Sequence, residues 1–311
     1  MSKKRYIHRL QVALTEGFLR LFGHLPLGWH RRCARFFSWI IRSVAHYRTQ
    51  VVSTNLARSF PEKTYDELQD IQKQFYRYFA TVFTEMVWFS ACRGAKGRER
   101  LHRSHIVEFT NPEELNRLYG ASRQLMLLQG HCSNWELVGG VCYYSYGTPL
   151  DIFPEILCVA HHGIASSVWS DVMEHVRLSP VCDKHITGYV PTDGVLRYAL
   201  SHKEDKICYF FMTDQYPYMG NGTMDVEFMH QPTRSMSGGA ALARKLDMAM
   251  GYLRYRCRPD GGYTMTVVPL CEHAAQEDPQ ALIRRYYELL EEDLREQPWN
   301  YLWTHKRWKK Q

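Results

Sequence analysis

The pattern of apolar and polar positions changes near Asn111. Between Tyr65 and Cys92, apolar residues recur at three- and four-residue steps, the spacing of one face of a long amphipathic helix. After Asn111, short apolar runs alternate with stretches of helical period. The apolar runs predict strands at 125–129, 156–160, 207–212, 249–254 and 263–270. The stretches between them predict helices near 134–144, 165–176, 193–201, 238–246 and 279–297. This alternation predicts an α/β fold with a mixed central sheet flanked by helices.

A chain of 311 residues with 45% hydrophobic content can bury a large core. No linker rich in proline, glycine or serine interrupts it, and no internal repeat divides it. Composition changes only near the start, where basic residues are concentrated. We therefore expect two parts: a basic amphipathic helical region over residues 1–60 and a main domain over residues 61–311.

The first fifty residues are strongly basic and should be attracted to an anionic surface. Glu16 is their single acid, and their lysines and arginines are Lys3, Lys4, Arg5, Arg9, Arg20, Arg31, Arg32, Arg35, Arg42 and Arg48. Bulky apolar residues lie between these charges: Phe18, Leu19, Leu21, Phe22, Leu25, Leu27, Trp29, Phe36, Phe37, Trp39, Ile40 and Ile41. Such a mixture suits a pair of amphipathic helices in a bilayer interface, and no nucleic-acid-binding motif accompanies it. We expect a membrane partner and no nucleic acid.

The longest uncharged run in this region, residues 21–30, is much shorter than the roughly 18 residues of a membrane-spanning helix. The sequence therefore predicts monotopic attachment, with a single tilted N-terminal span as the alternative. No small-residue cleavage site follows the region, so we expect no removable signal peptide.

A candidate general base follows the first predicted strand of the main domain. His131 comes after Gly130, and Glu136 lies five residues further on. Imidazole has a pKa near neutrality and can take a proton from a hydroxyl, with a carboxylate to orient it. Two positions five apart diverge on a regular helix, so we expect His131 in the turn before a helix capped by Ser133. The same residues also match a capping box, in which Glu136 bonds the backbone of Ser133. Both interpretations stay open at this point.

Two other polar clusters follow predicted elements. Asp214 and Gln215 come after the strand at 207–212, where ligand sites of α/β folds gather, although an aspartate there can also serve a turn. In residues 232–241, Arg234 and two serines, Ser235 and Ser237, precede a glycine pair at a predicted helix start. This arrangement suits an anion or oxyanion site, or simply close packing of the glycines.

Cysteine and histidine chemistry is less favoured. The nine cysteines include no C-x-x-C pair and are expected to be reduced, mostly buried thiols. Cys132 adjoins His131, but neighbours in sequence rarely present their side chains to each other, so a Cys/His nucleophile is not expected. His161 and His162 with His131 and Asp214 lack a helical ligand spacing, so no metal is expected. The aromatic and basic C-terminal tail, residues 299–310, suits either a headgroup zone or packing on the domain.

Four blocks of sequence in the same order resemble the lauroyl/myristoyl acyltransferases of lipid A biosynthesis, a branch of the H-x4-D/E glycerolipid acyltransferase superfamily. They are VSTNLARSFP at 52–61, GHCSNWE at 130–136, TDQ at 213–215 and YLWTHKRW at 301–308. The resemblance runs over nearly the whole chain. It identifies residues 61–311 as an acyltransferase catalytic domain.

The resemblance implies transfer of a fatty acyl group from an acyl carrier protein thioester to a hydroxyl of a lipid A precursor, at the cytoplasmic face of the bacterial inner membrane. His131 would be the base and Glu136 its partner, with no acyl-enzyme. Expected partners are the carrier protein, the lipid acceptor and the membrane surface; the phosphopantetheine thioester is a co-substrate, and no further cofactor is expected. We expect a monomer. Expected substrate-binding residues are Asp214, Gln215, Arg234, Ser237 and Asn134.

One departure limits how far the acceptor can be named. The family usually carries a basic residue and a proline in the strand after the H-x4-E helix, whereas residues 158–163 contain no arginine or lysine. His161 or His162 could substitute, or Lys184 or Arg234 could reach in from another loop. The alternatives are therefore acylation of a different membrane polar lipid, such as a lysophospholipid or aminolipid, or a catalytically silent lipid- or carrier-binding module. Coenzyme A is an alternative donor.

Overall fold

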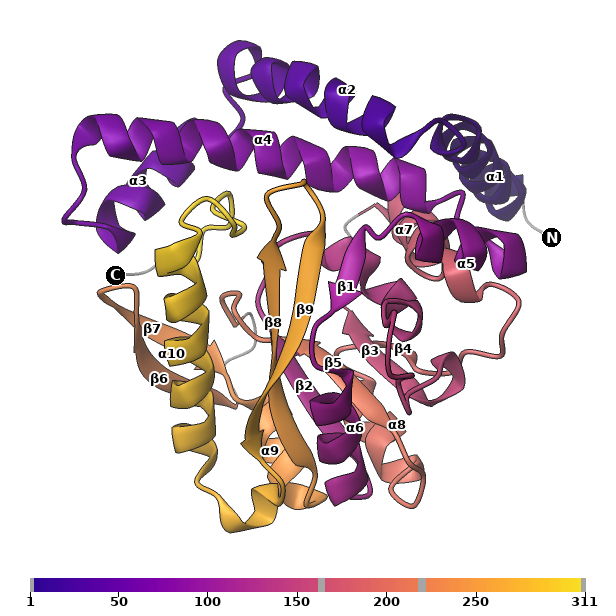
Figure 1. Cartoon of the computed structure of the whole chain (residues 1–311), viewed down its shortest axis with the longest axis vertical. Coiled ribbons are helices and arrows are strands. Elements are labelled where there is room, and N and C mark those ends of the chain that lie inside the picture. Colours follow the sequence, from indigo (N-terminus) through magenta and orange to yellow (C-terminus); the bar gives the residue numbers. More distant parts are fainter. Residues whose placement is uncertain (1–2, 162–165, 218–221, 309–311) are drawn as a thin grey trace.

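The computed structural model describes residues 3–161, 166–217 and 222–308. Its centre is a seven-stranded sheet with the strand order β1-β9-β8-β2-β5-β3-β4 (Figure 1). Neighbouring strands are parallel except β8 and β9, which are antiparallel. The strands are β1 (Val107–Phe109), β2 (Leu125–Gln129), β3 (Leu157–His161), β4 (Tyr189–Pro191), β5 (Cys208–Met212), β8 (Ala249–Cys257) and β9 (Tyr263–Cys271). The mixed α/β architecture expected from the sequence is confirmed.

A separate antiparallel hairpin lies beside α10 and was not predicted. It consists of β6 (Thr223–Phe228) and β7 (Gln231–Met236). Residues of β7 alternate between buried and exposed, and the buried positions include Gln231, Thr233 and Ser235. Because these buried residues are polar, the segment has the alternation of a strand without its apolar signal, and no strand was predicted before the helix at 238.

Helices cover both faces of the sheet. The long predicted helix is α4 (Tyr65–Phe89), which begins with a capping box between Thr64 and Glu67. Four other predicted helices are confirmed within a few residues: α7 (Ser167–Arg177), α8 (Val195–Ser201), α9 (Gly238–Lys245) and α10 (Pro279–Glu296). The remaining α-helices are α1 (Lys3–Gly23), α2 (Leu27–Trp39), α3 (Thr49–Ser59), α5 (Gly94–Arg103) and α6 (Pro112–Ala121). A π-helical turn, Ile40–Val44, continues α2, and short 3₁₀ turns are Pro154–Ile156, Ser179–Val181 and Ala274–Gln276.

Strand β2 divides the apolar interior into two cores. Met126 and Leu128 pack into the core shared with α9 and α10, whereas Leu125 and Leu127 pack into the core shared with α6 and α7. Successive side chains of a strand point to opposite faces, so a run of consecutive apolar residues is what a sheet covered on both sides requires. The central position of β2 explains why its bounds could be read directly from the sequence.

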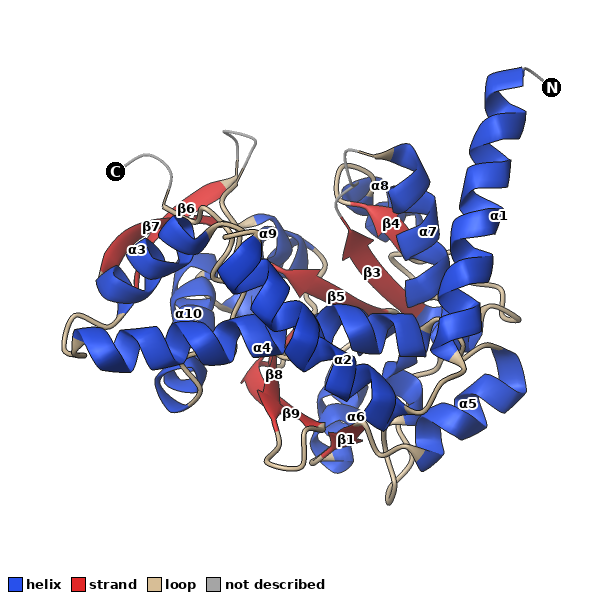
Figure 2. Ribbon diagram, turned by 90° about the horizontal axis from the view of Figure 1, so that it is seen from above, coloured by secondary structure: helices blue, strands red, loops and turns tan. Residues whose placement is uncertain are grey.

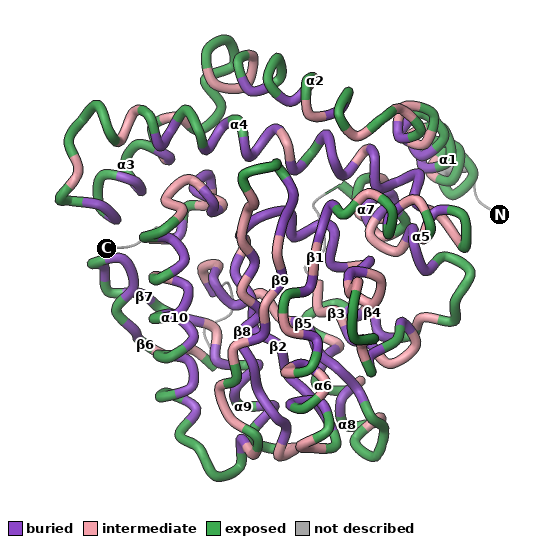
Figure 3. The backbone as a smooth tube through the Cα atoms, viewed as in Figure 1, coloured by how far each residue is buried: buried purple, intermediate pink, exposed green. Residues whose placement is uncertain are grey.

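The N-terminal helices form an outer layer against α4 (Figures 1 and 2). Along α1, Leu10, Leu14, Phe18 and Leu21 recur at helical spacing and are exposed, while Leu19 on the opposite face is buried. Helix α2 likewise exposes four large aromatic residues: Trp29, Phe36, Phe37 and Trp39. Figure 3 shows the exposed outer side of both helices. The expected pair of amphipathic helices is therefore present, and its apolar faces point outward.

Helix α3 is more closely integrated. Its Val52 and Leu56, with Phe60 just after it, belong to the same buried core as α10. None of the helices in the described ranges is long and apolar enough to cross a membrane. The division at residue 60 stays a prediction, but the packing already shows that residues 49–60 contribute to the core of the main domain.

Candidate active site

The site lies where two neighbouring parallel strands end. Gln129, the last residue of β2, pairs in register with Met212, the last residue of β5. His131 therefore follows one strand by the same two residues by which Asp214 follows the other. Parallel strands end at the same edge of a sheet, and the two side chains meet there.

His131 and Asp214 make two hydrogen bonds to each other. The imidazole Nδ1 lies 2.7 Å from Oδ1 of Asp214, and the backbone N–H of His131 donates to Oδ2 over 3.0 Å. On the far side of the ring, Nε2 lies 3.0 Å from the amide Nε2 of Gln215. With Nδ1 protonated towards the carboxylate, Nε2 carries the lone pair and can accept from the amide. This tautomer is the one that a general base at Nε2 requires.

Burial shapes the electrostatics of this pair. The side chain of His131 is 14% exposed and that of Asp214 is 1% exposed. Burial by itself raises the pKa of Asp214, but the charge of His131 and the hydrogen bonds from its ring and backbone outweigh burial and lower the pKa below the usual value of 3.8. Asp214 is therefore held as a carboxylate at neutral pH, facing the imidazole.

Glu136 has a different partner from the one expected. Its two carboxylate oxygens accept hydrogen bonds from Nε and Nη2 of Arg177, over 2.6 Å and 2.9 Å, at the end of α7. The indole N–H of Trp135 also donates to Glu136 over 2.9 Å. Burial is the largest single effect and raises the pKa of Glu136, but the charge of Arg177 and the hydrogen bonds from Arg177 and Trp135 together outweigh it, so the pKa is lowered. The orienting carboxylate at Nδ1 of His131 is thus Asp214, and the expected direct pairing with Glu136 is not seen.

The capping alternative for Glu136 is also wrong. The segment Trp135–Tyr143 is a 3₁₀ helix whose first turn receives no side-chain cap. Ser133 has a positive φ of 52° instead of a capping conformation. Its backbone N–H donates to Asn300, and its hydroxyl donates to the carbonyl of Tyr255. The loop of His131 is therefore held by the C-terminal tail and β8, and His131 does precede the helix, as expected.

Trp135 connects the two charged pairs. Its ring centroid lies 5.5 Å from that of His131 in a nearly perpendicular arrangement, while its N–H binds Glu136. Glu136 and Arg177 therefore fix the ring that forms one wall beside the imidazole. Arg177 also donates to the hydroxyl of Tyr189, whose ring stacks on His161 at a centroid distance of 4.0 Å.

The other residues expected to bind substrate lie in different parts of the structure. Asn134 is buried and donates to Glu85, a carboxylate that also binds Arg31 of α2 and the hydroxyl of Tyr263. These contacts are structural, and because Asn134 is fully buried, its side chain is not accessible to a substrate. Through Glu85, Asn134 thereby links the loop of His131 to the N-terminal layer.

Arg234 and Ser237 lie on the hairpin side. Arg234 is exposed on β7, with its Nε 3.7 Å from Asp225 of β6. Ser237 is buried, its backbone N–H donates to the carbonyl of Gly222, and its side chain makes no capping hydrogen bond to α9. Lys184, one of the alternatives for the missing basic residue, pairs with Glu155: its Nζ lies 3.4 Å from Oε1 of that carboxylate. Of the residues expected to bind substrate, Asp214 and Gln215 contact His131 in the described part of the chain, and the others do not.

Buried tyrosines hold the two strand ends, and two of them, Tyr286 and Tyr287, were not picked out from the sequence. Tyr286 donates to the carbonyl of Gln129, Tyr287 to that of Thr213, and Tyr301 to that of Asp214. Tyr286 and Tyr287 belong to α10, where adjacent buried aromatics on an amphipathic helix were the available signal. They stabilise the backbone on both sides of the catalytic pair.

The C-terminal tail packs on the domain, as one of its two interpretations expected. Trp303 and Arg307 are fully buried, and the indole of Trp308 donates to Thr233. The headgroup alternative does not apply to these side chains; Lys309 and Lys310 lie outside the described residues.

Cys132 is buried, and burial raises its pKa well above the usual thiol value. A thiol that stays protonated is a poor nucleophile. Within the described ranges, no three histidine, cysteine or acidic side chains come together as metal ligands, and His162 falls outside those ranges.

The sequence matches the family model for bacterial lipid A biosynthesis acyltransferases over residues 2–149 and 190–310. The unmatched stretch between them contains β3, α7 and Arg177. No curated protein is similar enough to the chain to match it. Since the family model covers both strand ends that carry the His131–Asp214 pair and most of the chain around them, this protein belongs to the bacterial lipid A biosynthesis acyltransferase family and is an acyltransferase.

Proposed function

We propose that this acyltransferase moves a fatty acyl chain from an acyl carrier protein thioester to a hydroxyl group of a lipid A precursor. The observation that carries the proposal is the buried hydrogen-bonded pair of His131 and Asp214, at the strand ends of a chain with this family assignment. The pair presents a general base and needs neither a metal nor an acyl-enzyme.

In the proposed reaction, Nε2 of His131 takes the proton of the acceptor hydroxyl as its oxygen attacks the thioester carbonyl. Asp214 keeps the imidazole in the required tautomer and stabilises the imidazolium that forms. The new C–O bond then replaces the C–S bond, and the imidazolium returns its proton to the departing thiolate. Gln215, at hydrogen-bond distance from Nε2, marks the position that the hydroxyl would take.

In this mechanism Glu136 acts through Trp135. Arg177 holds the carboxylate of Glu136 through two hydrogen bonds, and that carboxylate accepts the indole N–H of Trp135 beside the imidazole. The charge of His131 also acts to lower the pKa of Glu136, so the two groups lie within electrostatic reach of each other. We therefore assign proton transfer to the His131–Asp214 pair and treat Glu136 and Arg177 as positioning residues.

The proposed location is the cytoplasmic face of the inner membrane, with monotopic attachment. The support is the outward apolar face of α1 and α2, which is built from aromatic and aliphatic side chains next to arginines. Such a surface is suited to the interface of a bilayer, where the acceptor lipid resides. The carrier protein would bring the donor from the aqueous side.

A specific observation supports a second acceptor class. Residues 150–189 fall outside the family match, and the described part of 158–163 contains no arginine or lysine. This is the region of Arg177, which is already bound to Glu136, so its charge is largely neutralised. A different polar lipid of the same membrane, such as a lysophospholipid or aminolipid, is therefore the alternative acceptor.

The test combines a lipid inventory with purified components. Mass spectrometry of total lipids from cells with and without the gene should reveal one lost mass, which identifies the acyl group and the acceptor. Purified protein should then transfer that acyl group from a carrier-protein thioester, with coenzyme A thioester as the competing donor. No lost mass, together with no transfer to any membrane lipid, would mean a silent binding module.

A further inference from the structure

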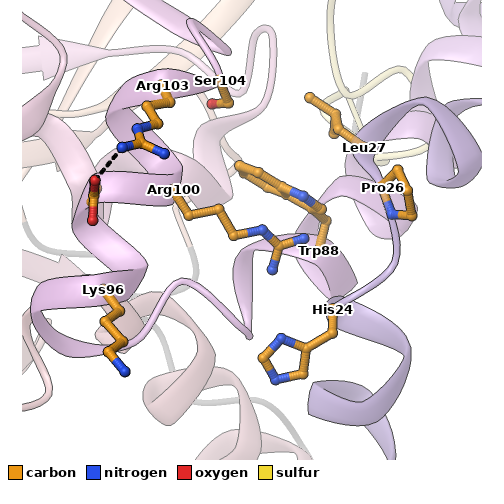
Figure 4. Close-up of a pocket in the computed structure, with 9 residues that line it drawn as sticks. His24, Pro26, Leu27, Trp88, Lys96, Arg100, Arg103 and Ser104 are labelled. Carbon is orange, nitrogen blue, oxygen red and sulfur yellow. Dashed lines mark hydrogen bonds and ion pairs between the residues drawn. The ribbon is translucent and has the colours of Figure 1, made fainter.

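A basic hollow lies at the elbow between α1 and α2, beside α5 and the end of α4. Its volume is about 450 Å³, which is within the range of small-ligand sites, about 300–1,000 Å³. Helix α5 contributes Lys96, Glu99, Arg100 and Arg103, and Ser104 directly follows it. The elbow contributes His24, Pro26 and Leu27, and the end of α4 contributes Trp88. Figure 4 shows the basic side chains of α5 on one side and His24, Pro26 and Leu27 on the other.

Arg100 is the central residue of this hollow. Its Nη2 donates to the carbonyls of Gly23 and Leu25, so it ties α5 to the end of α1. Its guanidinium carbon lies 4.8 Å from the ring centroid of Trp88. A second guanidinium nitrogen, Nη1, is shielded from water and has no hydrogen-bond partner among the described residues. A half-buried guanidinium with an unused donor is suited to accept an anion.

The charge balance around Arg100 also favours an anion. Glu99 is the single acid of the lining, and it is bound to Arg103. In the described part of the chain, Arg100 forms no ion pair, and burial lowers its pKa without a carboxylate to offset the effect. Lys96 is exposed at the edge of the hollow. The positive charge therefore exceeds the negative charge at a site that water only partly screens.

The surroundings identify the class of anion. Pro26 and Leu27 line the hollow, and the neighbouring Leu21 and Trp29 are exposed apolar side chains. A ligand that carries both a phosphate and acyl tails would place its charge against Arg100 and its tails along the outer face of α1 and α2. A carrier protein would direct its single acyl chain to His131 for transfer, which leaves no apolar group for the outer face of α1 and α2. The combination therefore favours a lipid.

We propose that this hollow binds the phosphate of an anionic phospholipid headgroup. The proposal rests on the proposed membrane attachment but not on the acyl-transfer reaction. Arg100 and Lys96 would hold the phosphate oxygens, and the elbow would sit at headgroup depth. The site would fix the tilt of the N-terminal layer on the bilayer and would be separate from the acceptor site at His131.

The first test uses full-length protein and monomeric dihexanoyl phosphatidylglycerol, measured by calorimetry, with inorganic phosphate as a second ligand. We expect the wild-type protein to bind this lipid saturably. In Lys96→Ala/Arg103→Ala, the affinity for the lipid should fall roughly fivefold for each cation removed. Arg100→Gln should abolish it, with circular dichroism to check folding. Glu99→Gln should tighten it, because the one acid of the lining is lost. The matched control is Arg32→Ala/Arg35→Ala, which removes the same charge from α2 outside the hollow and should bind normally.

The second test measures flotation with vesicles of phosphatidylcholine, with and without phosphatidylglycerol. Lys96→Ala/Arg103→Ala should lose more of the phosphatidylglycerol-dependent binding than the control Arg32→Ala/Arg35→Ala. Equal losses, or no saturable binding of the monomeric lipid, would overturn the site. Two outcomes would overturn the lipid assignment. In the first, Lys96→Ala/Arg103→Ala loses binding of inorganic phosphate but keeps its binding to vesicles. In the second, this variant selectively loses binding of the carrier protein. Failure of the wild-type protein to bind any vesicle would instead contradict membrane attachment.

Discussion

Two buried carboxylates lie near His131, and they differ in what they bind. Asp214, at the end of β5, bonds both the ring and the backbone of His131. Glu136, in the 3₁₀ helix after the same loop, gives both oxygens to Arg177. Asp214 faces a group whose charge changes during proton transfer, whereas Glu136 faces a permanent cation. The first can therefore support chemistry directly, and the second chiefly supports the wall that contains it.

This difference shows why a motif's spacing alone does not assign roles. In an H-x4-E sequence the glutamate is the nearest acid along the chain. In the folded protein, the acid that reaches Nδ1 comes from a neighbouring strand 83 residues away. The following changes separate the two carboxylates by experiment.

The largest effect is expected from His131→Ala. Loss of the base should lower kcat by about 10²–10⁴-fold with purified donor and acceptor. Because His131 is partly exposed at the edge of the sheet, the fold should be retained, and circular dichroism provides the check. A folded His131→Ala protein that transfers acyl groups at the wild-type rate would refute the base assignment.

Asp214→Asn should come next. The amide keeps the shape but cannot stabilise an imidazolium and can turn the ring to the wrong tautomer, so we expect a loss of kcat of about 10²-fold or more. The KM for the thioester should change little. Matched measurements on Glu136→Gln decide the comparison: if that variant loses more kcat than Asp214→Asn, Glu136 is the true partner of His131.

Glu136→Gln should act mainly on stability. It leaves Arg177, whose side chain is 25% exposed, without its carboxylate. Breaking one side of a buried ion pair costs about 3–5 kcal/mol, and we expect the lower end of that range for this partly exposed pair. The double variant Glu136→Gln/Arg177→Met should recover much of the free energy of unfolding, as measured by urea denaturation. Additive losses in the double variant would show that the two side chains do not act as a pair.

The dependence of stability on pH should follow both acids. The native pKa values of Asp214 and Glu136 are lowered, so their stabilisation is present above the unfolded values, about 4, and disappears as the pH falls through the lower native values. Denaturation curves between about pH 6 and pH 3 should therefore show falling stability. Asp214→Asn should flatten that curve, and a slope that stays the same would contradict the assignment of its pKa.

Gln215→Ala should have the smallest effect. Its amide lies at Nε2 but transfers no proton, so we expect a severalfold change that falls mostly on KM for the acceptor, consistent with one neutral hydrogen bond of about 1 kcal/mol. A loss of kcat as large as that of Asp214→Asn would give Gln215 a direct part in the reaction.

Much of the fold could be predicted because its central strands are buried on both faces. Strand β2 consists of consecutive apolar residues before Gln129, and its bounds follow from that pattern alone. The hairpin strand β7 buries Gln231, Thr233 and Ser235, so its polar letters concealed the strand. Strands β1 and β4 have three residues each, too few for a periodic signal.

The candidate site was predictable in its members more than in its pairings. His131 and Asp214 both follow apolar runs, which identified them as residues at strand ends. Their contact depends on β2 and β5 being neighbours, and strand order is set by long-range packing that spacing does not contain. Arg177 was missed because an arginine at the end of an amphipathic helix usually faces solvent.

The buried carboxylate of Glu85 has a consequence for how the protein can be shortened. It receives Arg31 from the N-terminal layer and Asn134 from the loop of the catalytic histidine. Removing residues 1–48 to obtain a water-soluble fragment would delete that arginine and leave a negative charge stranded beneath the reaction centre. We therefore expect such a truncation to lose activity because the loop of His131 misfolds. The N-terminal layer thus stabilises the fold of the enzyme in addition to its proposed role as a membrane anchor.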